Sequence, residues 1–209
     1  AYSNSYTAPV VVGQVLTAND SAWSSFWARG STPSEPPSSS AFYAGKMVGQ
    51  DGTTSRANEE IGYIVFESGQ GTIDGLTYAA GVGADIVAGT GNAPPYAYAL
   101  TGFQSVTSAV VSSAGMDGSD GGWPLLYGSP PLTTTALNLA IDEDQLTDVE
   151  RLHSTEQVAY VVFGVADPSA LTLVGIRATA ANSAWPLLIV AALLALTTAL
   201  FTRRKDANL

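Results

Sequence analysis

The chain contains no cysteine in its 209 residues. Disulfide bonds and thiolate metal ligands are therefore excluded, and the fold has to rest on a buried core, for which this length suffices. Histidine occurs once, at His153, which excludes a histidine-rich metal site. A Ser/His/Asp arrangement would have to use this ring, and no serine lies in a GxSxG motif. We favour a locally hydrogen-bonded histidine and predict that the protein is not an enzyme.

Positive charge is scarce, with eight Lys and Arg against 18 Asp and Glu. Residues 1–183 carry five Lys/Arg and seventeen Asp/Glu, a net charge of −12, and residues 203–209 add +2, which gives the total of −10. An acidic surface repels phosphate backbones, so nucleic-acid binding is excluded. A glycine-rich phosphate loop between a strand and a helix is also missing from the sequence, and no organic cofactor is predicted.

Glycine and proline are abundant instead, with 21 and 11 residues. Together with Ser and Asn they separate short β-branched and aromatic runs, and residues 1–183 show no sustained helical period of apolar residues. This pattern predicts antiparallel β-sheets.

One strand is written nearly twice, as EEIGYIVFESG from Glu59 and as TEQVAYVVFGV from Thr155. Glu59 aligns with Glu156 and Tyr63 with Tyr160, and in each copy these two side chains fall on the same face of a strand. Carboxylates repeated at equivalent scaffold positions favour packing or backbone hydrogen bonding over a glycosidase pair.

Other segments recur in the same order. The run VVVGQVLTAND from Val10 has a counterpart in VTSAVVSSAGMD from Val106, and AFYAGKM from Ala41 matches ALNLAID from Ala136. The fold class predicted is mainly β, with two tandem, related antiparallel β-sandwich units followed by one C-terminal transmembrane helix. The predicted domains are a first repeat (1–80), a connection (81–102), a second repeat (103–177), a membrane-proximal linker (178–183), the transmembrane helix (184–202) and a basic tail (203–209).

The membrane helix is predicted from AWPLLIVAALLALTTALFT, residues 184–202, which contains no charge and has the length of a bilayer core. Its expected anchors are Trp185 at the interface, Pro186 in the first turn and the basic cluster Arg203, Arg204 and Lys205. A buried globular helix is the alternative. The basic tail places the C-terminus in the cytoplasm and the β-rich part outside, periplasmic or extracellular, and Ala1 fits a chain trimmed by signal peptidase.

Two resemblances add to this reading. The phrase HSTEQVAY, His153 to Tyr160, followed by VVFG, resembles the strand signature of H-type-lectin-like β-sandwich domains; the first copy keeps Glu59 and Tyr63 but has Arg56 in place of the histidine. The resemblance implies an antiparallel sandwich, frequent oligomerisation and, in some members, sugar binding. The apolar run followed by RRK is similar to the sorting signals of bacterial surface proteins, although SAWP stands where their proline-glutamate motif would be.

Two groups of residues are candidate binding positions. Carboxylates beside glycine turns suit calcium, with solvated turns of an acidic protein as the favoured alternative; these are Asp117, Asp120, Asp142 and Asp144. Large aromatic side chains beside a proline-rich segment suit a docking or sugar-binding surface, with core filling as the alternative; these are Trp23, Phe26, Trp27 and Trp123.

The leading functional hypothesis is a non-catalytic, membrane-anchored accessory or structural subunit. Its extracytoplasmic domains would dock on integral membrane subunits of a larger complex, for example a photosynthetic or respiratory one, and residues 184–202 would contact the bilayer. The alternative is a surface-anchored carbohydrate-binding or adhesive module. A membrane-tethered hydrolase is the third hypothesis.

Overall fold

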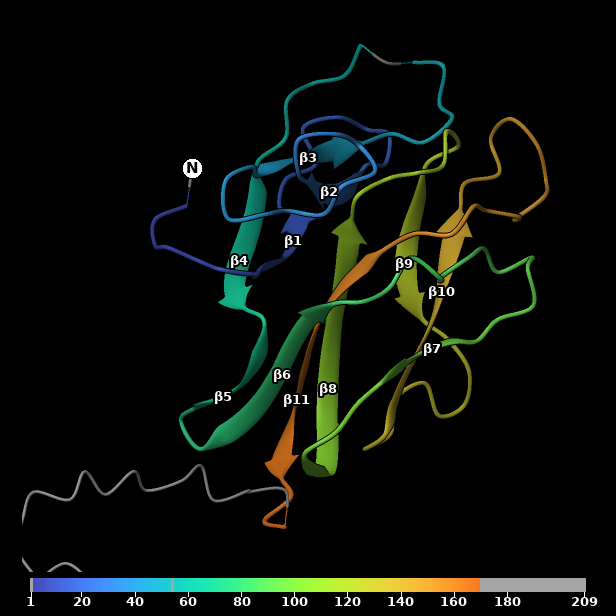
Figure 1. Cartoon of the computed structure of the whole chain (residues 1–209). Coiled ribbons are helices and arrows are strands. Elements are labelled where there is room, and N and C mark those ends of the chain that lie inside the picture. Colours follow the sequence, from blue (N-terminus) through green and yellow to red (C-terminus); the bar gives the residue numbers. More distant parts are fainter. Residues whose placement is uncertain (1, 54, 170–209) are drawn as a thin grey trace, which may run out of the picture. The chain divides into compact units, whose positions relative to one another are not determined.

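Every regular element of the described residues is a β-strand (Figure 1). The computed structural model describes residues 2–53 and 55–169, and these confirm the prediction of a mainly β protein with several sheets. The eleven strands are β1 (Pro9–Val15), β2 (Ser25–Arg29), β3 (Tyr43–Met47), β4 (Ile61–Glu67), β5 (Gly69–Ile73), β6 (Leu76–Val82), β7 (Tyr96–Ala99), β8 (Phe103–Ala114), β9 (Gly122–Leu126), β10 (Ala136–Glu143) and β11 (Val158–Ala166).

A search of the described residues finds no helix that is long and apolar enough to cross a membrane. The predicted span 184–202 lies outside them, as do its expected anchors Trp185, Pro186, Arg203, Arg204 and Lys205.

The strands form three sheets. The largest has six strands in the order β3-β2-β8-β11-β6-β5, and the others are β7-β10-β9 and the pair β1-β4. Pairing between the eleven strands is antiparallel except between β2 and β8, which run parallel at Trp27 opposite Ser113 and Ala28 opposite Ala114. The expectation of purely antiparallel sheets is therefore corrected to mixed sheets. The exception arises because β2 joins the end of a strand far away in the chain, where no hairpin fixes the direction.

Alternation along β11 explains how the sheets are layered. Val158 and Val162 pack into one buried cluster, whereas Ala159 and Val161 on the opposite face pack into another. Neighbouring residues of a strand point to opposite faces, so a strand that is apolar at both sets of positions needs a covering layer on each side.

Three clusters fill the spaces between the layers. The first, with Leu137 and Leu139 of β10, lies between the β8-β11-β6 region and the sheet β7-β10-β9. The second joins Val10 and Val12 of β1 to the opposite face of that region. The third contains Val11 of β1 and the buried apolar side chains of β2. Figure 1 shows the pair β1-β4 and the strands β7, β9 and β10 on opposite sides of the long strands β8 and β11.

The two similar stretches of sequence make equivalent pairs. Strand β1 pairs with β4, with Val15 opposite Ile61, and β8 pairs with β11, with Ser113 opposite Val158. Likewise, β2 pairs with β3 and β9 pairs with β10. The six-stranded sheet takes strands from both stretches, and the described residues all fall in one compact unit.

Truncation of Leu139, whose side chain is fully buried in the first cluster, tests this core. We expect Leu139→Ala to lower the free energy of unfolding by about 2–5 kcal/mol, because it removes apolar contacts and leaves a cavity. Leu152→Ala is the matched control, since Leu152 is 53% exposed and its truncation is expected to change the stability by less than about 0.5 kcal/mol. Urea unfolding of both variants measures the difference, and equal losses would contradict the assigned core.

Candidate functional site

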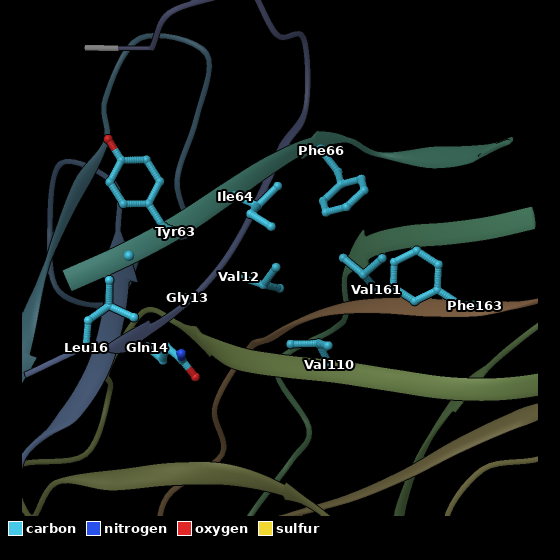
Figure 2. Close-up of a pocket in the computed structure, with 11 residues that line it drawn as sticks. Val12, Gly13, Gln14, Leu16, Tyr63, Ile64, Phe66, Val110, Val161 and Phe163 are labelled. Carbon is cyan, nitrogen blue, oxygen red and sulfur yellow. The ribbon is translucent and has the colours of Figure 1, made fainter. Parts of the chain in front are cut away.

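An apolar groove of about 440 Å³ runs between the equivalent strand pairs β1-β4 and β8-β11 (Figure 2). Leu16 follows β1, Tyr63 and Ile64 belong to β4, and Val110 belongs to β8. These four side chains are 56%, 46%, 63% and 47% exposed, respectively. Tyr63 points to the opposite face of β4, where its ring meets Phe42. Large apolar side chains are normally exposed singly, so Leu16, Ile64 and Val110 around one hollow form a patch that is typical of an interaction surface.

A glycine and a contact between two aromatic rings shape this groove. Gly62 lies beneath Leu16, and a Cβ on Gly62 would come within 2.8 Å of Leu16 Cδ1, so glycine allows the leucine to lie across β4. Phe66 and Phe163, which occupy equivalent positions in the two stretches, meet edge to face with their ring centroids 6.5 Å apart. Both rings line the groove, and the partly buried phenylalanines also pack on the second cluster.

The hydroxyl of Ser112 on β8 forms hydrogen bonds with the backbone of β1. Ser112 Oγ accepts the Gly13 N–H at 3.0 Å and donates to the Gly13 carbonyl at 3.3 Å. One side chain thus satisfies both polar backbone groups of Gly13 where β1 lies against β8 without a ladder. The groove walls are therefore joined by hydrogen bonds as well as by apolar contacts.

The repeated glutamates perform the same structural task in both stretches. Glu59 accepts hydrogen bonds from the Thr17 hydroxyl and from the backbone N–H groups of Asn19 and Asp20. Those bonds hold the pKa of Glu59 below its usual range, the Thr17 hydroxyl contributing most. In the second stretch Glu156 accepts the N–H groups of Asp117 and Gly118 at 2.9 Å.

His153 is buried between two carboxylates. Its Nε2 lies 3.1 Å from Oε1 of Glu156 and its Nδ1 lies 3.8 Å from Oε2 of Glu143. Burial opposes protonation, but the hydrogen bond and charge of Glu156 and the charges of Glu143 and Asp120 outweigh it, so the pKa of His153 is raised. Burial also raises the pKa of Glu143, which is 3% exposed.

The four predicted aromatic residues separate into three settings. Trp23 and Trp123 meet edge to face, with ring centroids 5.3 Å apart. Phe26 is buried in the third cluster, and Trp27 lies under the guanidinium of Arg29, whose Cζ is 5.5 Å from the ring centroid. Trp23 and Trp123, which are far apart in the sequence, therefore form one surface feature, whereas Phe26 fills the core.

The predicted calcium carboxylates are held by different protein groups. Asp120 accepts a hydrogen bond from the Ser119 hydroxyl, Asp142 pairs with Arg151, and Asp144 accepts the backbone N–H groups of Gln50 and Leu146. Burial and the nearby negative charges of Glu156 and Asp85 raise the pKa of Asp117. In the part of the chain that the structure describes, no group of three or more His, Asp or Glu side chains is arranged to hold a metal ion.

Sequence reasoning did not select the groove residues as a site. The available signal is Ile64, an isoleucine on the strand face opposite to Glu59 and Tyr63, at the position where the second stretch has Val161, which is buried. Leu16 and Val110 carry no comparable signal, because their exposure depends on how the two strand pairs meet.

Comparisons of the chain with family models, with curated proteins and with solved structures find no match.

The buried histidine predicts a pH dependence of stability. Because the folded-state pKa of His153 is raised, protonation of its ring stabilises the fold fully below the unfolded value of about 6.5, and this contribution is lost as pH rises through the folded value. The raised pKa of Glu143 acts in the same direction. We expect the urea midpoint to fall between about pH 6 and pH 8, and to fall much less in His153→Gln. An equal pH dependence in the variant would contradict this assignment.

Proposed function

We propose that this protein is a non-catalytic, membrane-anchored accessory or structural subunit. Its β-rich part docks on an integral membrane subunit through the groove between β1-β4 and β8-β11. The observation that carries the proposal is the exposure of Leu16, Ile64 and Val110 around this hollow.

The chemistry of the groove indicates what would fill it. Its walls offer aliphatic and aromatic surface, with Gln14 as the polar side chain that lines it. A row of apolar side chains from the partner would bury this surface, and each large side chain that loses water contributes favourably to association. Because residues 1–183 carry a net charge of −12, a partner with Lys or Arg around that row would be steered toward this domain.

The setting of the ionisable groups supports a binding role over a hydrolytic one. His153 is 5% exposed, and its Nε2 is hydrogen-bonded to Glu156. The Glu156 carboxylate also accepts hydrogen bonds from backbone N–H groups. The recurrent glutamates thus support loops in both stretches, as their repetition in the sequence suggested.

Anchoring is proposed from the sequence. Residues 184–202 supply an uncharged apolar run of bilayer length, and the following Arg203, Arg204 and Lys205 favour a cytoplasmic tail, which leaves the β-rich part outside the cytoplasm. We further propose that this part arose by duplication of a β-sandwich unit. The equivalent pairs β1-β4 and β8-β11, and β2-β3 and β9-β10, support that origin.

Docking is tested by placing a carboxylate in the groove. We expect Ile64→Glu to reduce the amount of co-purifying membrane protein by about tenfold or more, because a charge in the middle of an apolar contact is desolvated without a partner. Gentle detergent extraction from the native membrane, native electrophoresis and mass spectrometry measure the associated chains.

The matched control is Val149→Glu, which adds the same charge at an apolar position that is 85% exposed and is not among the groove-lining residues. It should retain the partners. Migration of the unmodified chain alone, or loss of partners in the control as much as in Ile64→Glu, would refute docking through the groove.

A further inference from the structure

A second hollow, apart from the groove, lies beside Trp23 and Trp123. It has a volume of about 510 Å³, and its lining includes Trp23, Trp123, Asp144, Gln145 and Leu146. The sequence separates these residues widely, and the fold gathers them where the loop before β2 meets β9 and the segment after β10. We refer to this hollow as the tryptophan cleft.

The two indoles form a corner of the cleft. Their centroids are 5.3 Å apart and their planes make an angle of 65°, so the face of one ring meets the edge of the other. Both side chains are only half-buried. The π face of an aromatic ring carries partial negative charge, and tryptophan is the strongest of the aromatic side chains in attracting a cation.

A fixed carboxylate completes the lining. Asp144 is 6% exposed, and its oxygens accept the Gln50 N–H at 2.8 Å and the Leu146 N–H at 3.1 Å. The turn at Gly49 packs closely on it: Gly49 has a φ of +60°, and a Cβ there would collide with Asp144 Oδ2 and lie 2.9 Å from Trp23 Cη2. Glycine at this position thus permits the backbone to hold Asp144 beside the indole.

The negative charge of Asp144 has no cationic side chain beside it among the described residues. The ion pairs found there join Arg56 to Asp20 and Asp51, Arg151 to Asp142, and His153 to its two glutamates. The backbone N–H groups stabilise the carboxylate but leave its net charge uncompensated. A bound cation would supply the missing positive charge.

We propose that the tryptophan cleft binds an organic ammonium cation, with Trp23 and Trp123 against its methyl or methylene groups and Asp144 as counter-ion. Two aromatic walls and one carboxylate match a bulky, weakly hydrated cation, which gains from ring contacts and Coulomb attraction together. An anion is disfavoured by Asp144 and by the net charge of −12 over residues 1–183. This inference goes beyond the proposed docking function and uses none of the groove residues.

Choline is the probe for this site. Titration calorimetry of the full chain, in a polyoxyethylene ether detergent, compares choline with its uncharged isostere 3,3-dimethylbutan-1-ol and with maltose. We expect saturable binding of choline and at least about tenfold weaker binding of the isostere, which has the same shape without the charge. Equal affinity for the isostere, or binding of maltose without choline, would overturn the proposal.

Variants place the binding in the cleft. Asp144→Asn and Trp23→Leu are each expected to weaken choline binding by about tenfold or more. Their matched controls are Asp148→Asn, an exposed acid of the same segment, and Trp27→Leu, which changes a tryptophan that does not line the cleft. Circular dichroism checks that each variant is folded. Unchanged affinity in a folded Asp144→Asn, or equal losses in the control variants, would overturn the site.

A competition experiment distinguishes a lipid headgroup from a free cation as the source of the ammonium group. Dihexanoylphosphatidylcholine and dihexanoylphosphatidylglycerol are titrated as competitors of bound choline. Displacement at lower concentration by the choline lipid than by free choline assigns a lipid headgroup, whereas weaker displacement assigns a free cation, and both support the chemistry proposed. Equal displacement by the glycerol lipid, which carries no ammonium group, would contradict it.

Discussion

The architecture depends on the need to bury both faces of β11 and its neighbours. Val158 and Val162 are 0% exposed on one face, and Ala159 and Val161 are 0% and 1% exposed on the other. A strand of this composition has no face for water, so it requires a layer on either side. The sheet β7-β10-β9 supplies one layer and the pair β1-β4 supplies the other. The groove exists because the pair β1-β4 covers β8 and β11 incompletely, so that Val110 of β8 stays accessible.

The glutamate positions illustrate how one structural solution is used in two electrostatic environments. Glu59 and Glu156 both accept backbone N–H groups from the loop that follows their partner strand, so the carboxylate is a substitute for the hydrogen bonds that an irregular loop lacks. Around Glu156 the fold has added a buried histidine and a second carboxylate. In the first stretch Arg56 stands at the position aligned with His153, and it pairs with Asp20 and Asp51 instead of with the glutamate. The same scaffold therefore balances its charge by two routes.

Local patterns predicted the features that depend on neighbouring residues. The alternation in VAYVVFG identified β11 and its two faces, and the recurrence of Glu59 at Glu156 indicated a shared backbone role. Features that depend on long-range geometry were not accessible in this way. The parallel pairing of β2 with β8 is not preceded by a hairpin or crossover motif that would predict it. The contact between Trp23 and Trp123 depends on how separate segments of the chain come together. Aromatic composition indicated an interaction surface without distinguishing Trp23 from the buried Phe26.

The second cluster has a consequence for how the chain reaches its native state during synthesis. Val10 and Val12 are synthesised well before the strand that covers them, β11, which lies near the end of the described chain. Contacts of such sequence separation form slowly, because a long loop has to close before they can contribute. Until then the β1-β4 pair carries an uncovered apolar face, the kind of surface that chaperones recognise and that promotes aggregation. Folding of the described part therefore depends on a strand near its C-terminal end, and the apolar face of β1-β4 stays uncovered until β11 has been synthesised.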